Sequence, residues 1–484
     1  MIVDYSHRRE VTKKSLYSFF FTRKIVSLPS IMTKRKKKKK IKWSGVALLV
    51  LILATILAAV VSLIWWLGSL LVGWIFPNDS HSSPIDSVEL VDPALILQDS
   101  IRAAEVGMLV KNAYRLDSTL LGLYVYDATT HQTVYEVNAD KRFIPASCMK
   151  IPTAIAALER LGMDHRYVTT LQVRGDMVGD TLVGELLLQA DDDPMILTLD
   201  SLVGMMQETG IRAVRGRLAY DLSREDALSS HPSTQTWDIK SSRVPTLLKG
   251  RAFVQDAFRA ALSRRGVAVI PDSTVAREGA WREVSRQETA LTDVLSPMLQ
   301  FSSNVKAEAV FYHLDRAEGL IRDRQMHWEH PHAVEDFWHR YFLGESQFMG
   351  LKSLKMQGVV INDGSGLSPQ NRLSPRLLVE MLQYAWNRDS LRNYLIDEGL
   401  ATPGEYPRRG SLSGRMSSPI FRNRVFVKTG TLTSEAVSSL AGFIHSSDEH
   451  WYIFAIINQR CPVSEGRIFQ DDFCRLFVRQ KQQK

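Results

Sequence analysis

Cysteine is scarce in this sequence: only Cys148, Cys461 and Cys474 occur among 484 residues. So few and so widely spaced cysteines exclude a disulfide-stapled scaffold and a cysteine-based metal site. Cys461 and Cys474 can still form one disulfide in an oxidising compartment if the fold brings them together. The sequence leaves that question open.

Charge is missing from one long stretch. No charged residue occurs over the 33 positions 44–76, directly after the Lys/Arg run at 34–40. About 20 apolar residues suffice to cross the ~30 Å hydrocarbon core of a bilayer. A cleaved signal peptide has a shorter apolar region followed by a small-x-small cleavage site, which is not evident here. We therefore predict a transmembrane anchor at 43–76, preceded by a basic cytoplasmic tail at 1–42.

The excess of basic residues is confined to that tail. Residues 1–42 hold 14 Lys/Arg and 2 Asp/Glu, which leaves 46 basic and 50 acidic residues in 43–484. The formal net charge of +8 therefore does not describe a basic globular surface, and we expect no nucleic-acid partner. By the positive-inside rule the tail stays cytoplasmic. We expect a single-pass protein of the cytoplasmic membrane whose folded part lies on the periplasmic or extracellular side.

Hydrophobic periodicity organises the rest of the chain. Residues 77–94 read as a linker, because Pro, Ser, Asn and Asp dominate its first part. Alternating apolar residues predict two early strands and three late ones, at 121–127, 132–138, 424–429, 437–444 and 451–458. Helical spacing occurs at 146–161, 305–314, 376–386 and 465–480. We predict an α+β fold whose antiparallel sheet is built from both ends of the domain.

Residues 166–290 differ from the rest of the chain in their hydrophobic pattern. Strand patterns at 168–173, 182–189 and 213–220 are separated by Gly-Asp turns, with one helical pattern at 199–210. We interpret this stretch as an inserted β-rich subdomain. The surrounding domain then comprises 95–165 and 291–484.

Three short motifs follow one another along the chain: Ser147-Cys148-Met149-Lys150, Ser302-Ser303-Asn304 and Lys428-Thr429-Gly430. Penicillin-interacting serine enzymes carry this S-x-x-K, S-x-N and K-T-G set. An S-x-x-K alone arises by chance about once in 200 to 250 residues. Ser303 to Lys306 is such a second copy. Context favours Ser147, because it opens an apolar helix on which Ser147 and Lys150 share one face.

The first two motifs suggest an acyl-transfer site. A serine hydroxyl is a weak nucleophile until a base takes its proton, and a lysine can do so when burial or nearby positive charge destabilises its ammonium form. We therefore assign Ser147 as the nucleophile and Lys150 as its base. Ser302 can relay a proton, and Asn304 can bind a peptide group of the substrate.

The third motif suggests a substrate-binding strand. Gly430 leaves the strand edge free of a side chain, so that an extended peptide can lie against it. Lys428 and Thr429 can hold a terminal carboxylate. The backbone N–H groups of Ser147 and Thr431 then form the oxyanion hole.

Longer stretches carry a family resemblance. Residues 143–150, 363–368 and 427–433, with 304–308 and 410–412, resemble the D-Ala-D-Ala carboxypeptidase/endopeptidase family of class C low-molecular-mass penicillin-binding proteins. The resemblance covers about residues 95–460. It implies the serine β-lactamase/DD-peptidase fold, an acyl-enzyme, no cofactor, and a peptidoglycan stem peptide ending in D-Ala-D-Ala as substrate. It also implies that β-lactams act as acylating inhibitors.

Two alternatives to a DD-peptidase stay open. A serine β-lactamase carries the same motifs but must deacylate quickly, and no motif here assures a deacylating carboxylate. A catalytically silent envelope scaffold that binds muropeptides is the other alternative. It has no physical need for Lys150 or Lys428.

Some features depart from the family pattern. The 151 residues between Lys150 and Ser302 are fewer than the family insert leads us to expect, so an insert subdomain is reduced or absent. Pro152 removes an N–H early in the nucleophile helix and can tilt Ser147. We expect Cys148 to pack in the core rather than to react.

Three polar groups outside the motifs are candidates for simpler roles. We interpret Asp191–Asp193 as a polar turn. The histidines at 327, 330, 332 and 339 fit no H-E-x-x-H pattern, so we predict no metal site. Asp363 stands between two equal interpretations, lining the cleft or capping a turn.

Overall fold

The computed structural model describes residues 93–113, 115–228, 241–275, 278–317, 332–344, 354–404 and 406–479. All of them belong to one unit, Leu90–Lys484. The predicted tail at 1–42, the predicted anchor at 43–76 and linker residues 77–92 lie outside the described residues. Within these ranges no helix is both long and apolar enough to span a bilayer.

The first sheet joins the two ends of the folded chain, as predicted. Its strand order is β2-β1-β10-β9-β8, and every neighbouring pair is antiparallel. The strands are β1 (Leu121–Asp127), β2 (Gln132–Val137), β8 (Val425–Leu432), β9 (Val437–His445) and β10 (Trp451–Asn458). β8 is an edge strand of this sheet: no other named strand of the described residues pairs with its outer side, where Val427 alone bridges to Ala401. The rest of that side can pair with a further extended chain.

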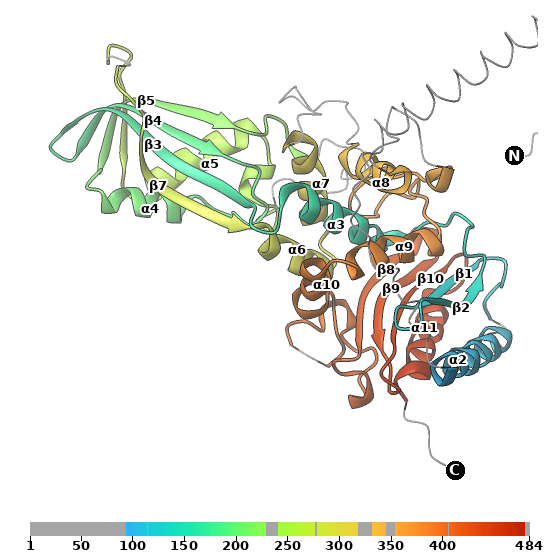
Figure 1. Cartoon of the computed structure of the whole chain (residues 1–484). Coiled ribbons are helices and arrows are strands. Elements are labelled where there is room, and N and C mark those ends of the chain that lie inside the picture. Colours follow the sequence, from blue (N-terminus) through green and yellow to red (C-terminus); the bar gives the residue numbers. More distant parts are fainter. Residues whose placement is uncertain are drawn as a thin grey trace, which may run out of the picture. The chain divides into compact units, whose positions relative to one another are not determined.

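Alternating side chains of this sheet fill two separate cores. Leu123 and Phe454 belong to one core together with residues of α2 (Pro93–Asn112) and α11 (Val463–Val478). Tyr124 and Ile453, their neighbours in sequence, belong to the core of the helical half. Figure 1 shows α2 and α11 on one side of the sheet and α9 on the other. This period of two is the pattern expected of strands buried on both faces.

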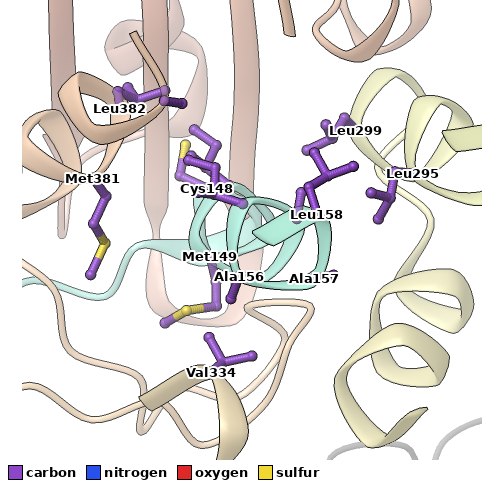
Figure 2. Packing of buried hydrophobic residues seen from close by; sticks show 14 of the residues in the cluster. Cys148, Met149, Ala156, Ala157, Leu158, Leu295, Leu299, Val334, Met381 and Leu382 are labelled. Carbon is purple, nitrogen blue, oxygen red and sulfur yellow. The ribbon is translucent and has the colours of Figure 1, made fainter. Parts of the chain in front are cut away.

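The helical half surrounds α3 (Lys150–Leu161), the helix predicted to begin with the nucleophile motif. Its other helices are α6 (Leu291–Gln300), α7 (Asn304–Ala317), α8 (Ala333–Leu343), α9 (Pro375–Trp386) and α10 (Asp389–Tyr394). Figure 2 shows Leu158 of α3 beside Leu295 and Leu299 of α6, with Val334 of α8 below Met149. Helices on several sides therefore fix α3 in place.

A second sheet lies between Arg166 and Ala290. Its order is β6-β5-β4-β3-β7, with β4, β5 and β6 parallel and β3 antiparallel to both of its neighbours. The strands are β3 (Arg166–Val178), β4 (Thr181–Ala190), β5 (Ala213–Leu222), β6 (Ala268–Pro271) and β7 (Arg282–Ala290). Helices α4 (Asp200–Glu208) and α5 (Arg251–Arg264) share its core (Figure 1). The fold is therefore a mixed α+β fold with two sheets, while the exact domain boundaries stay a prediction.

Asp191–Asp193, interpreted from the sequence as a polar turn, follow β4, and both Asp192 and Asp193 are buried there. Asp192 is fully buried, and its carboxylate contacts Arg224 (3.0 Å), Arg316 (2.9 Å) and His313 (2.8 Å). Although burial opposes it, the two guanidinium groups and the hydrogen bond with His313 hold the pKa of Asp192 far below its usual value. Since His313 and Arg316 belong to α7, this ion cluster joins the second sheet to the helical half.

All three cysteines are free and buried. The pairing of Cys461 with Cys474 that the sequence left open is therefore absent in this structure. Cys474, on α11, instead belongs to the core between that helix and the sheet.

Candidate active site

Ser147 lies in a short 3-10 turn, η1 (Ala146–Met149), that leads directly into α3. Ala146 has a φ of +46°, a left-handed conformation that is uncommon for a residue with a side chain. Ser147 is partly exposed, whereas Ala146, Cys148 and Met149 around it are buried. The turn therefore presents one hydroxyl to solvent on an otherwise buried segment.

Lys150 stands behind that hydroxyl and is fully buried. Its Nζ makes hydrogen bonds with Ser147 Oγ (3.0 Å), Asn304 Oδ1 (2.9 Å) and the Ser365 carbonyl oxygen (2.6 Å). A neutral amine has two N–H groups and one lone pair. Because Asn304 Oδ1 and the Ser365 carbonyl can only accept, they take the two N–H groups. The lone pair is then left to receive the proton of Ser147.

Electrostatics favours the neutral form of this amine. Burial lowers the pKa of Lys150 well below its ordinary value, and the positive charge of Lys428 lowers it further. Asp363 and Glu308 act in the opposite direction. Lys428 is also fully buried, and burial lowers its own pKa to about 8.

Gly430 lies where β8 passes close to η1. A Cβ atom on Gly430 would stand 2.1 Å from Ser439 Oγ and 3.0 Å from both Pro145 O and Ser147 N. The first N–H groups of a helical turn have no partner inside the helix, so the Ser147 N–H is available at this contact. The glycine is thus required by a close backbone approach, and Thr431 follows it on the same strand.

Lys428 and Thr429, both predicted to hold a carboxylate, have different surroundings. Lys428 Nζ donates to the Thr429 carbonyl oxygen (2.6 Å) from inside the protein. Thr429 Oγ1 instead makes a hydrogen bond with Ser411 Oγ (2.7 Å), and Ser411 is partly exposed. Thr429 and Ser411 are therefore better placed to touch a ligand, and Lys428 supplies positive charge from behind.

Thr431 is the last of the predicted binding residues on β8. Its Oγ1 accepts a hydrogen bond from Arg467 Nη2 (3.1 Å), a residue of α11. This contact engages the Thr431 side chain, whereas the predicted oxyanion hole needs only its backbone N–H. The Thr431 backbone N–H stays a predicted oxyanion donor, and the side-chain contact links the end of β8 to α11.

Among the described residues, the hydrogen-bond partners of Lys150 Nζ do not include Ser302. It has a φ of +60°, again left-handed, and its hydroxyl makes no hydrogen bond to another described residue. The next residue, Ser303, accepts a hydrogen bond from the Lys306 backbone N–H (3.4 Å) at the start of α7. Lys306 Nζ lies near Pro194 O (3.4 Å) instead of Ser303. The second S-x-x-K copy therefore lacks a base beside its serine.

The loop 363–368 contributes contacts that motif reasoning missed. Its Ser365 carbonyl accepts from Lys150, and its Gly364 carbonyl accepts from Thr153 Oγ1 (3.0 Å) one turn further along α3. Gly366 has a φ of +79°, and a Cβ on it would stand 1.8 Å from Ala146 O. The Gly-rich sequence at 363–368 was the available signal for such a tight loop.

Asp363 caps this loop from inside. Its two carboxylate oxygens accept from Gly366 N (2.6 Å), Ser368 N (2.6 Å) and Asn371 Nδ2 (2.8 Å). It is fully buried. Of the two interpretations left open by the sequence, the turn-capping one is confirmed.

Pro152 and Cys148 both fit the site without disturbing it. Pro152 is the third residue of α3, where no intrahelical N–H bond is needed, and its carbonyl accepts from Trp338 Nε1 (3.2 Å). Cys148 is fully buried and donates to the Lys428 carbonyl oxygen (3.3 Å). Burial raises the pKa of its thiol. The packing role predicted for Cys148 agrees with both observations.

A cluster of possible metal ligands lies on other elements. Asp99 of α2, Asp127 of β1 and His450 are buried together in the described part of the chain. His450 is hydrogen-bonded to Asp127, and Thr130 Oγ1 (2.6 Å) and Tyr452 OH (3.2 Å) donate to Asp99. Internal hydrogen bonds hold both carboxylates and His450 Nδ1, whereas His450 Nε2 is buried without a hydrogen-bond partner among the described residues. Of the four histidines weighed above, His327 and His330 lie outside the described residues.

Comparison with known proteins agrees with this geometry. The family model described as "D-Ala-D-Ala carboxypeptidase 3 (S13) family" matches residues 103–247 and 246–473. A D-alanyl-D-alanine carboxypeptidase of Actinomadura sp. (strain R39) is 23% identical over 437 residues, covering 71% of this chain and 78% of that protein. The D-alanyl-D-alanine carboxypeptidase DacB of Haemophilus influenzae is 22% identical over 401 residues, covering 67% and 82%.

A solved structure shares the fold. Penicillin-binding protein 4 (dacB) from Haemophilus influenzae superimposes with a TM-score of 0.57 at 18% identity, over 76% of this chain and 99% of that one. Its complex with a β-lactam gives a TM-score of 0.55 at the same identity, over 78% and 100%. The family match covers well over half of this chain and confirms the resemblance carried by the motifs. The chain belongs to the D-Ala-D-Ala carboxypeptidase 3 (S13) family of low-molecular-mass penicillin-binding proteins, and it is a serine DD-peptidase.

Proposed function

We propose that this DD-peptidase cleaves peptidoglycan stem peptides through an acyl-enzyme on Ser147, with Lys150 as the base. The observation that carries the proposal is the set of three hydrogen bonds around the buried Lys150 amine. Two of them hold its N–H groups, and the third joins it to the Ser147 hydroxyl. Such a preorganised pair of nucleophile and base is what covalent acyl transfer requires.

Acylation begins when Lys150 takes the proton of Ser147. Ser147 Oγ then attacks the carbonyl carbon of the penultimate D-Ala, and negative charge develops on the carbonyl oxygen. The backbone N–H groups of Ser147 and Thr431 stabilise that charge. The substrate peptide extends along β8, which Gly430 keeps free of a side chain where the strand passes close to η1.

Release of the product needs the same proton again. The Lys150 ammonium returns it to the departing amine, directly or through the Ser302 hydroxyl, as the C–N bond breaks. Water then attacks the ester carbonyl while Lys150 accepts a proton from it, and Lys150 returns that proton to Ser147 Oγ as the ester C–O bond breaks. Carboxypeptidase and endopeptidase action share these steps and differ only in the leaving amine, which is a free D-Ala or a cross-linked stem peptide.

The terminal carboxylate of the substrate has a matching partner set. Thr429 and Ser411 offer hydroxyls joined to each other (2.7 Å), with the buried Lys428 charge behind them. This electrostatic arrangement favours a substrate whose leaving group ends in a carboxylate, and a β-lactam carboxylate fits the same position.

We also propose that the catalytic unit faces the cell envelope. The support is the uncharged segment 44–76 next to the Lys/Arg run at 34–40, which together predict an anchor with its basic tail in the cytoplasm. The peptidoglycan substrate lies on the other side of that membrane.

The direct test is cleavage of purified muropeptides, followed by mass spectrometry of the products. The wild type is expected to release D-Ala from a pentapeptide, to split a D-Ala-linked dimer, or to do both. Ser147→Ala should lose both activities. Ser303→Ala, which alters the other S-x-x-K serine, should retain them. No cleavage by the wild type, or equal cleavage by Ser147→Ala, would overturn the proposal.

A further inference from the structure

Glu308 is a buried carboxyl group that the mechanism above does not use. It lies on α7, one turn after Asn304, and is fully buried. Its Oε1 accepts a hydrogen bond from the Ser365 backbone N–H (3.1 Å). Its Oε2 is buried without a hydrogen-bond partner among the described residues. An ionised carboxylate left unpaired in such a place is costly, so its neutral form is favoured.

The backbone at Ser365 connects this carboxyl group to the base. The Ser365 N–H donates to Glu308, while the Ser365 carbonyl accepts from Lys150 (2.6 Å). Glu308 thus holds the N–H group of Ser365, while the carbonyl group of the same residue holds an N–H of the Lys150 amine. Asp363 supports the same carbonyl, because it accepts from the Gly366 N–H (2.6 Å) of the peptide group to which that carbonyl belongs.

We propose that Glu308 is a positioning residue for Lys150: it holds the Ser365 carbonyl that orients the amine, and its charge state tunes the strength of the base. This role deepens the function proposed above and rests on it. Glu308 does not touch the substrate. It acts through the Ser365 backbone and, as a nearby charge, through space.

The groups facing Glu308 determine how it titrates. They are Lys150 from α3, Asp363 from the loop 363–368, and Tyr312 from α7 itself, with the Arg224 guanidinium over the Tyr312 ring (5.6 Å). Burial, reinforced by the negative charge of Asp363, raises the pKa of Glu308 to about 8. Glu308 is therefore neutral at pH 7 and becomes charged as the pH rises through 8.

The charge on Glu308 changes one step of the reaction. In acylation the proton moves from Ser147 Oγ to Lys150 Nζ, so positive charge appears on Lys150. An ionised Glu308 stabilises that charge and makes Lys150 a stronger base. Glu308→Gln keeps a side-chain oxygen for the Ser365 N–H but cannot ionise, so it fixes the neutral state permanently.

The test compares full-length wild type and Glu308→Gln in the rate constant for acylation by a fluorescent penicillin between pH 6 and 9.5. Lys428 also titrates near pH 8, but it is present in both proteins, so the ratio of their rate constants removes its effect. We expect the wild-type rate constant divided by that of Glu308→Gln to lie within about twofold of one below pH 7. This ratio should rise about fivefold as the pH increases through 8. A ratio that does not change with pH overturns the proposal.

Two further variants complete the test. Glu380→Gln alters a partly exposed carboxylate of α9 that is paired with Lys355, and it should give a ratio that does not change with pH. Glu308→Ala removes the acceptor itself and should slow acylation about tenfold or more at every pH, because Lys150 loses its alignment. If Glu308→Ala does not fold, Glu308→Gln decides alone. If the wild type itself is not acylated, the proposed function is wrong. If the wild type is acylated but the ratio of rate constants does not change with pH, only the proposed role of Glu308 is wrong.

Discussion

At the scale of single residues, the sequence identified the side chains of the site but not the backbone around them. Ser147, Lys150 and Asn304 were all predicted and do meet. The Ser365 carbonyl was not predicted, because a carbonyl acceptor carries no residue identity and any amino acid supplies one. The buried position of Lys428 was also not foreseen, because a lysine is mostly exposed unless its surroundings compensate.

Removing the charge of Lys428 should shift the pH dependence of acylation. Burial and the Lys428 charge both lower the pKa of Lys150. In Lys428→Gln the second effect is lost, so the pKa of Lys150 rises and the amine stays protonated to higher pH. The acidic limb of the acylation rate profile should move upward by about half a pH unit or more.

Penicillin acylation rates measured from pH 5 to 9 check this prediction. Lys355→Gln, which removes an exposed lysine of the helical half, serves as the control and should leave the limb in place. If Lys428→Gln only weakens penicillin binding and leaves the acidic limb of the rate profile in place, Lys428 acts on the ligand and not on the pKa of Lys150.

At the scale of elements, periodicity predicted the strands and helices well, since each is specified by its own side chains. The sheet joining β1 to β10 followed from counting strands at both ends of the chain. Contacts between elements far apart in sequence were harder. Asp192 lay in an apparent polar turn, and nothing local indicates that Arg224 and Arg316 come to meet it.

Gly430→Ala should damage the site without unfolding the protein. The new Cβ would stand 2.1 Å from Ser439 Oγ and 3.0 Å from Ser147 N, so β8 and η1 must separate. We expect acylation to slow by about tenfold or more, since a small displacement of reacting groups or oxyanion donors is costly. Gly107→Ala is the matched control, because its Cβ makes ordinary contact with Tyr135 at 3.4 Å. Equal acylation rates in the two variants would contradict the close approach of β8 to η1.

Asp192→Asn should destabilise the fold. Removing the anion leaves Arg224 and the partly buried Arg316 without their shared partner, at a cost of about 3–5 kcal/mol in the free energy of unfolding. Urea denaturation at pH 7 measures this loss. Arg286→Gln, which removes exposed ion pairs with Glu283 and Glu288, should change the free energy of unfolding by less than about 1 kcal/mol.

The destabilisation caused by Asp192→Asn should depend on pH in the acid range. In the folded protein the pKa of Asp192 lies far below its usual value. Ionised Asp192 therefore contributes fully to the free energy of unfolding above about pH 4, and this contribution is lost as the pH falls below that value. The stability difference between wild type and Asp192→Asn should therefore shrink in that acid range. A difference that stays constant down to pH 2.5 would contradict the ionised Asp192 cluster.

At the scale of the whole molecule, one chain combines a predicted anchor with a DD-peptidase unit. The family membership rests on residues 103–473, and the anchor rests on the sequence of 44–76 alone. Motifs specified the family because their order and spacing are rarely met by chance. The arrangement of the second sheet was less predictable, because pairing between parallel strands depends on distant partners rather than on local pattern.

Membrane association can be tested by cell fractionation. The full chain should sediment with membranes and resist extraction by high salt and carbonate, because about 20 apolar residues are held in the bilayer. A variant lacking residues 1–76 should lose that association. Full-length protein that alkaline carbonate releases would contradict the anchor.

The central claim is that Ser147 is the acylated nucleophile, and intact-protein mass spectrometry after incubation with a penicillin tests it most directly. The account predicts a single long-lived adduct on the wild type that is absent from Ser147→Ala and retained by Ser303→Ala. An adduct that persists in Ser147→Ala would place the nucleophile elsewhere. Rapid penicillin hydrolysis without a stable adduct would show a β-lactamase, and an unlabelled wild type with intact drug would show a silent site.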